Sequence, residues 1–183
     1  MLLEQSDAEE KILKRVYREK NRSRRLIDHC LLLTDIYFFL QKQSEDNSQK
    51  LHFFTKTDLA RHYYLPYDRP DAYIATGDKE NHKKRYFLEI IDEGIPRFML
   101  RKRIEQYIEF YGSNKWQERT GHPFPSMLIV CPNETIKNFL HKHIGKVLEE
   151  EIEAEIDFFL ATKEDIESSE LKTNVWQKAD EEE

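Results

Sequence analysis

Residues 69–111, RPDAYIATGDKENHKKRYFLEIIDEGIPRFMLRKRIEQYIEFY, are the stretch that decides the fold. Apolar residues dominate 72–76 and 85–91, and a charged segment separates them, which predicts two strands joined by a hairpin loop. Gly94 and Pro96 interrupt the chain after the second strand, and proline suits the first turn of a new helix. Apolar residues at helical spacing follow, namely Leu100, Ile104, Tyr107, Ile108 and Tyr111. The stretch therefore predicts strand, turn, strand and a long amphipathic helix.

Three acidic residues lie at the ends of these strands. Asp71 stands at the start of the first strand, Glu89 near the end of the second, and Asp92 just beyond it. A hairpin can bring two such carboxylates together, and oxygen ligands on rigid elements are what a hard divalent cation such as magnesium or manganese needs. The commoner explanation is that Asp71 caps a turn and that Glu89 and Asp92 are ordinary strand-end acids. Spacing alone leaves both interpretations open.

The rest of the chain continues the pattern of alternating elements. Periodicity and turn signals predict further helices at 8–20, 23–43 and 134–152, and further strands at 51–57, 126–132 and 156–161. The last strand, helix and strand form a parallel crossover unit. This order predicts an α/β fold with a mixed sheet flanked by helices. We expect a loop at 112–125, and an acidic tail beyond Thr162 whose final residues are disordered.

The helix expected at 23–43 is apolar almost all round, so we expect it to be buried on more than one side. His29 and Asp35 are its interior polar residues, and a buried polar side chain needs a partner. A structural hydrogen bond is the commoner explanation, and a catalytic or ligand role is the alternative. A homodimer built on residues 26–40 is a further option.

Length and composition bound the class of protein. The 183 residues fit one domain, and 29 basic against 35 acidic residues give a net charge of −6. Any contact with nucleic acid must therefore be a local basic patch. Cys30 and Cys131 lie in apolar runs, which predicts buried free thiols. Residues 1–10 lack the basic start and apolar run of a signal peptide, and no apolar run is long enough to span a bilayer. We therefore expect no signal peptide, and a soluble cytoplasmic protein without membrane contact.

Residues 11–25 are the best candidate for such a patch, because they are strongly basic and contain Glu19 as their only acid. Basic side chains of this kind can bind DNA phosphates. The alternative is a solvated helix face that pairs with the acidic C-terminal half of the chain. The candidate DNA-binding residues are Lys11, Lys14, Arg15, Arg18, Arg22, Arg24 and Arg25.

Three motifs, RPDAYIA, RYFLEIIDEG and RIEQYIEFY, resemble the core of the replication-relaxation family of plasmid and integrative-element proteins. HCLLLTDIY, at residues 29–37, resembles the segment of that family in which a histidine and an acid or amide bracket apolar residues. The similarity covers roughly residues 25–147. It implies a fold related to the PD-(D/E)xK nucleases. Together with the charge pattern of the chain, we expect a basic N-terminal helix at 1–24, a nuclease-like core at 25–162 and the acidic tail at 163–183.

The resemblance also implies roles for individual residues. Asp71 and Glu89 would be metal ligands for magnesium or manganese, with Asp92 close by, and Asp35 could supply a further acid. Arg103 falls where the family has a basic residue on the helix. The implied partners are DNA and a replication or mobilisation protein.

Two departures bear on catalysis and on DNA recognition. The nuclease pattern has a lysine two positions after the second acid, and this chain has Ile91 there. Lys102 or Arg103 could reach in from the helix, but arginine is a poor proton acceptor. We expect no counterpart of the family's N-terminal winged helix in residues 1–183, because one basic helix precedes the core.

We therefore expect a DNA-binding accessory protein for replication or mobilisation of a plasmid or other mobile element. Whether it is also a divergent metal-dependent endonuclease, with Asp71, Glu89, Lys102 and Arg103 as catalytic residues, stays open. The alternative is a catalytically inactive protein–protein interaction module on the same fold.

Overall fold

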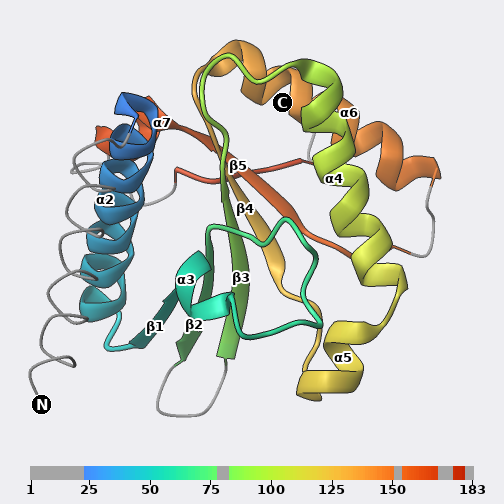
Figure 1. Cartoon of the computed structure of the whole chain (residues 1–183). Helices are drawn as coiled ribbons and strands as arrows, with labels where there is room; N and C mark the ends of the chain where they lie inside the picture. Colours follow the sequence, from blue (N-terminus) through green and yellow to red (C-terminus); the bar gives the residue numbers. More distant parts are fainter. Residues whose placement is uncertain (1–22, 78–82, 151–153, 169–174, 180–183) are drawn as a thin grey trace, which may run out of the picture.

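The computed structural model describes residues 23–77, 83–150, 154–168 and 175–179 (Figure 1). Its centre is a six-stranded sheet in which the strands lie side by side in chain order. The first three strands are antiparallel, the third, fourth and fifth are parallel, and the sixth is antiparallel to the fifth. The strands are β1 (Lys50–Thr55), β2 (Ala72–Gly77), β3 (Lys83–Ile90), β4 (Ser126–Cys131), β5 (Phe158–Thr162) and β6 (Gln177–Lys178). The predicted α/β fold with a mixed sheet is confirmed.

Helices cover both faces of this sheet (Figure 1). One face carries α2 (Arg24–Asp46) and α7 (Lys163–Glu167), and the other carries α4 (Arg97–Gly112), α5 (Lys115–Thr120) and α6 (Glu134–Glu150). The short α3 (Lys56–Leu59) follows β1. None of the helices within the described ranges is long and apolar enough to cross a membrane.

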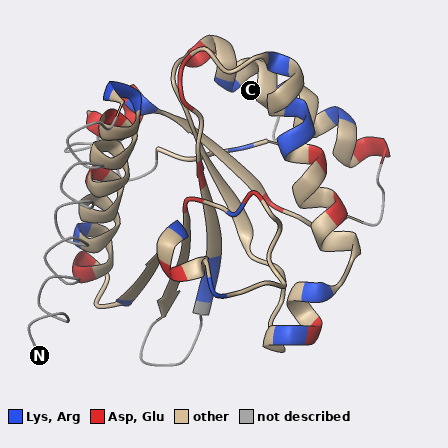
Figure 2. Ribbon diagram, in the orientation of Figure 1, with Lys and Arg blue, Asp and Glu red and all other residues tan. Residues whose placement is uncertain are grey.

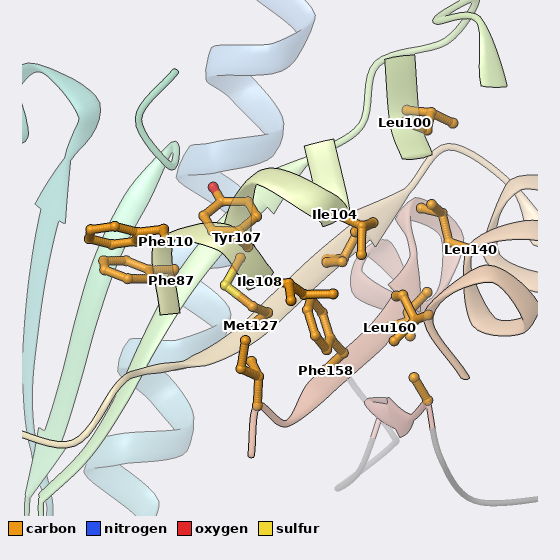
Figure 3. Packing of buried hydrophobic residues seen from close by; sticks show 14 of the residues in the cluster. Phe87, Leu100, Ile104, Tyr107, Ile108, Phe110, Met127, Leu140, Phe158 and Leu160 are labelled. Atoms are coloured by element: carbon orange, nitrogen blue, oxygen red, sulfur yellow. The ribbon is translucent and has the colours of Figure 1, made fainter. Parts of the chain in front are cut away.

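The protein has two hydrophobic cores, one on each face of the sheet. Strand β3 contributes residues to both, because successive side chains of a strand point to opposite faces. Phe87 lies in the core under α4, α5 and α6, together with Tyr107, Phe110 and Met127 (Figure 3). Leu88 lies in the core under α2, together with Ile36 of that helix. Both Phe87 and Leu88 are fully buried. Each face of β3 is therefore committed to a different layer of helices.

Helix α2 differs from the expectation in how it is buried. The sheet covers one stripe of it, formed by Leu32, Ile36, Leu40 and Ser44. The expectation that it is buried on more than one side is wrong for the part of the chain described here, because apolar residues of its outer face are exposed. These are Leu26, Ile27, Leu31 and Phe38. Cys30 is also exposed and only Cys131 is a buried thiol, so the prediction of two buried thiols is half correct.

Several short elements lie where none was expected. Helix α5 falls in the predicted loop at 112–125 and is anchored by Trp116, which is buried and donates a hydrogen bond from Nε1 to the Pro123 carbonyl oxygen over 2.9 Å. Helix α7 and strand β6 fall in the predicted acidic tail. The helix predicted at 8–20 and the final residues 180–183 lie outside the described residues.

The start of α7 provides a test of whether this segment belongs to the fold. The Thr162 hydroxyl accepts a hydrogen bond from the Asp165 N–H at 3.0 Å, and the Asp165 carboxylate accepts one from the Thr162 N–H at 3.0 Å. Replacing an N-cap residue typically costs about 1 kcal/mol. We therefore expect Thr162→Val to lower the free energy of unfolding in urea by about that amount, whereas Ser168→Ala, at the exposed end of α7, should change it by less than about 0.5 kcal/mol. Equal effects of the two changes would mean that the segment is a tail.

Candidate functional site

Asp71 lies at the junction of the first three strands. Because Ala72 is the register partner of Leu88, Asp71 comes alongside Glu89 one position further on. The Asp71 side chain is buried, and its Oδ2 accepts a hydrogen bond from the Ile90 N–H at 2.9 Å. Its carbonyl oxygen accepts one from the Lys56 N–H at 2.8 Å. The backbone of the sheet therefore fixes this carboxylate.

The partner of Asp71 is His29, on α2. The His29 Nε2 atom lies 3.4 Å from Asp71 Oδ1, and its Nδ1 atom lies 2.9 Å from Asp92 Oδ1. The hydrogen bond with Asp71 has the largest effect and raises the pKa of His29 to about 9, against the lowering effect of burial. Asp92 makes the shorter contact but is more exposed, so water weakens its effect. The imidazole is therefore a cation at neutral pH and bridges two carboxylates.

Asp71 is correspondingly ionised. Burial by itself would raise the pKa of its carboxyl group, but the hydrogen bonds with His29 and with the Ile90 N–H outweigh burial and lower it. Lys56 adds a third favourable interaction, with Nζ 3.7 Å from Asp71 Oδ1. Asp71 thus lies between two cations of its own chain.

Glu89 has a separate set of partners on α4. Arg103 donates hydrogen bonds from Nε to Glu89 Oε1 at 2.8 Å and from Nη2 to Oε2 at 2.7 Å. The Tyr107 hydroxyl donates a further one to Oε2 at 2.6 Å. Arg103 also donates to the carbonyl oxygens of Asp68 and Arg69, so its guanidinium holds the loop before β2 as well. Both oxygens of Glu89 are therefore engaged.

Burial dominates the electrostatics of this group. The side chains of Glu89 and Arg103 are each only 13% exposed. Burial raises the pKa of Glu89, whereas the charge and hydrogen bonds of Arg103 act against it. Burial, followed by the charge of Glu89, holds the pKa of Tyr107 well above its usual range, so Tyr107 remains a donor. A bidentate arginine–carboxylate pair with a third donor is a strong, geometrically defined contact.

Asp92, the third acid predicted as a ligand, is also in an ion pair. Its Oδ2 atom accepts a hydrogen bond from Arg25 Nε at 3.0 Å, while Oδ1 contacts His29. All three predicted metal ligands are thus paired with cations of the chain. Within the described ranges, no group of three or more histidine, cysteine, aspartate or glutamate residues is arranged to hold a metal ion.

The other predicted site residues are dispersed. Lys102 is exposed on α4 and makes no ion pair with any described residue, whereas its neighbour Arg103 reaches Glu89. Asp35 is exposed on α2, while His29 on the same helix is largely buried. Ile91, at the position of the nuclease lysine, is buried in the α4-side core.

The predicted DNA-binding residues are described only in part. Lys11, Lys14, Arg15, Arg18 and Arg22 lie outside the described residues. Arg24 and Arg25 form the first turn of α2, and their side chains are 86% and 56% exposed. Arg24 pairs with Asp28 at 2.9 Å, one helical turn away.

Sequence reasoning missed two residues of this site, Tyr107 and Lys56. Tyr107 lies four residues after Arg103, a spacing that puts both on one face of a helix, so the motif RIEQY carried the necessary signal. His29 was expected to need a structural partner, and it has two. No sequence signal pointed to Lys56, because its contact with Asp71 depends on how β1 pairs with β2.

Comparison of the chain with protein-family models, with curated proteins and with solved structures found no match.

Proposed function

We propose that the chain is a DNA-binding accessory protein for replication or mobilisation of a plasmid or other mobile element, and that the acids of its nuclease-like core act as structural ion pairs. The structural role of the acids is supported by the pairing of Glu89, whose two oxygens accept hydrogen bonds from Arg103 and Tyr107. DNA binding is supported by the exposed side chains of Arg24 and Arg25 at the start of α2. The motifs that resemble the replication-relaxation family supply the context of mobile DNA.

The side chains present do not fit a catalytic magnesium or manganese ion. A carboxylate that binds such an ion offers oxygen lone pairs to it, and Glu89 would have to release Arg103 to do so. Breaking a buried ion pair leaves an uncompensated charge, at about 3–5 kcal/mol. Arg103 cannot serve as a general base in the place of the absent lysine, since it keeps its proton at accessible pH. We therefore assign no metal-dependent step to this site.

Support for DNA binding comes from the position of the basic run. Its last two residues, Arg24 and Arg25, are exposed at the start of α2, where Figure 2 shows basic residues. The ion pair between Arg25 and Asp92 brings the end of this run to the acid site. Negatively charged phosphates bound at Arg24 and Arg25 would therefore adjoin the part of the molecule that carries the family motifs.

Salt dependence tests this function directly. We expect duplex DNA to bind at low salt and to dissociate steeply as salt rises, since bound phosphates release counterions. Replacing Lys14, Arg15 and Arg18 together by glutamine should reduce the slope of log K against log salt by about 0.9 for each phosphate that is no longer neutralised. The control, Lys115→Gln with Arg119→Gln, changes exposed residues of α5, which lies far from the start of α2 (Figure 1).

Two results would contradict the proposal. Absence of DNA binding even at low salt would favour the second candidate function, a protein-interaction module. That function is supported by the exposed apolar residues of α2, namely Leu26, Ile27, Leu31 and Phe38. Gel filtration would then show whether α2 joins two copies. Calorimetric binding of manganese that disappears in Asp71→Ala, together with plasmid nicking, would instead restore the nuclease interpretation.

A further inference from the structure

A cavity of about 540 Å³ lies on the α2 side of the sheet, separate from the acid site. It extends from the C-terminal part of α2 across strands β2 to β6, whereas the acids lie beside the first turns of that helix. Its volume falls in the range of pockets that hold small ligands, roughly 300–1,000 Å³. The residues that line it therefore indicate what it could bind.

Three aromatic side chains line this cavity, and they come from different segments: Tyr86 of β3, Phe159 of β5, and Trp176 just before β6. Each is half-buried, and none of the three is in ring contact with an aromatic side chain elsewhere in the described ranges. Other rings do have aromatic partners: Phe87 contacts Tyr107 and other rings on the opposite face of the sheet, and Tyr37 contacts Phe53 on the α2 side. No aromatic side chain of the described ranges therefore stacks on the three cavity rings.

The charge of the cavity is unusual for this chain. Its described lining contains Lys84 and Lys178 and no aspartate or glutamate, although the chain has 35 acids against 29 bases. Lys178 pairs with Asp157 at 3.0 Å, whereas Lys84 is exposed and forms no ion pair with a described residue. Asn47 and Gln49 add side-chain amides, which can donate and accept hydrogen bonds. An anionic ligand with a planar polar ring fits this lining.

We propose that this cavity binds a nucleotide unit, with its base against Tyr86, Phe159 and Trp176 and its phosphate at Lys84. Stacking of a base on an aromatic side chain stabilises binding and tolerates any sequence, because every base has an aromatic face. Base pairs of an intact duplex keep their bases stacked inside, so the ligand is an unpaired nucleotide. The proposal deepens the DNA-binding function and rests on it, but the described lining of the cavity includes neither Arg24 nor Arg25.

Tryptophan fluorescence gives a local readout of this site. The chain has two tryptophans: Trp176 lines the cavity, and Trp116 is buried on the other face of the sheet. We expect thymidine monophosphate and a ten-nucleotide oligo(dT) to quench the emission of the full chain. The quenching should disappear in Trp176→Phe, which retains Trp116. A response to oligo(dT) alone would identify the strand as the ligand, and a response to both would identify the nucleotide unit.

Affinity for labelled oligo(dT) supplies the second readout. Tyr86→Leu removes the ring but keeps an apolar side chain, and it should weaken binding roughly tenfold. Lys84→Gln changes an exposed side chain without a partner among the described residues, so we expect the fold to be retained. This change should weaken binding about fivefold. It should also reduce the salt dependence of binding by the equivalent of about one phosphate. Lys115→Gln, on α5, is the matched control and should leave affinity unchanged.

The outcomes separate this inference from the proposed function. If Lys84→Gln and Tyr86→Leu bind oligo(dT) like the wild type, the cavity is not a nucleotide site, whatever the duplex result. If salt-dependent duplex binding then persists, the proposed function stands alone. If instead oligo(dT) quenches Trp176 while duplex binding is absent, the nucleotide site stands and the role of residues 11–25 fails.

Discussion

Replacing Arg103 by methionine is expected to lower the free energy of unfolding by about 3–5 kcal/mol, because it leaves the Glu89 carboxylate buried without its cation. Methionine preserves most of the apolar part of the arginine side chain. The loss of stability therefore measures the contribution of the guanidinium and of its hydrogen bonds to Glu89, Asp68 and Arg69. For a chain of this length the midpoint of thermal unfolding should fall by roughly 10 °C. Urea denaturation of the wild type and the variant measures the change directly.

Two further variants make this result specific. Lys102→Met alters the adjacent, exposed residue of α4 and should change the free energy of unfolding by less than about 0.5 kcal/mol. Combining Arg103→Met with Glu89→Met removes both charges and should recover a large part of the loss, as replacing a whole buried pair often does. If Arg103→Met cost no more than Lys102→Met, Glu89 would not depend on Arg103, and its assignment as a structural ion pair would fail.

The second large effect is expected in the pH dependence of stability. His29 has a pKa of about 9 in the folded chain against an ordinary value of 6.5. Because the folded state holds this proton more tightly, the stabilisation is fully present below about pH 6.5 and is lost as the pH rises through 9. A shift of this size corresponds to at most about 3 kcal/mol. Urea denaturation between pH 6 and pH 9.5 should therefore show the wild type becoming less stable by up to that amount.

Variants at two histidines assign the effect. His29→Asn should be less stable than the wild type at pH 6, because Asp71 and Asp92 lose their shared cation, and the difference should narrow toward pH 9.5. His52→Asn, at an exposed position of β1, should follow the wild type throughout. A constant difference between His29→Asn and wild type across this range would mean that His29 does not carry the charge that joins α2 to the sheet.

The fold was largely predictable from the sequence because its main elements carry local signals. The hairpin of β2 and β3 and the helix after Pro96 follow from apolar runs, a charged turn and helical spacing, all within residues 69–111. Helix α5 was missed because a single residue, Trp116, anchors it through contacts with the sheet. The elements after Thr162 were missed because this segment is rich in charged residues and contains few apolar ones. Two of its apolar residues, Ile166 and Val175, nevertheless belong to the core.

The acids of the candidate site were predictable, and so was the approach of Arg103 from the helix, but the ion pairs that the acids form were not. The hairpin register that brings Asp71 alongside Glu89 is a short-range property of the sequence. Arg103, the partner of Glu89, is 14 residues away in the chain and belongs to the motif RIEQYIEFY. His29 is 63 residues from Asp92, and only the docking of α2 on the sheet brings them together. Whether an acid is free to bind a metal ion therefore depended on packing that local patterns do not encode.

Each face of β3 packs against a different layer of helices. This arrangement limits how the length of this part of the gene can change. Inserting or deleting one residue within the strand would exchange its two faces, moving Phe87 toward α2 and Leu88 toward α4. The same shift would turn Glu89 away from Arg103. Substitutions that keep the character of each position can accumulate in β3, whereas single-residue insertions and deletions there would disrupt both cores and the candidate site in one step.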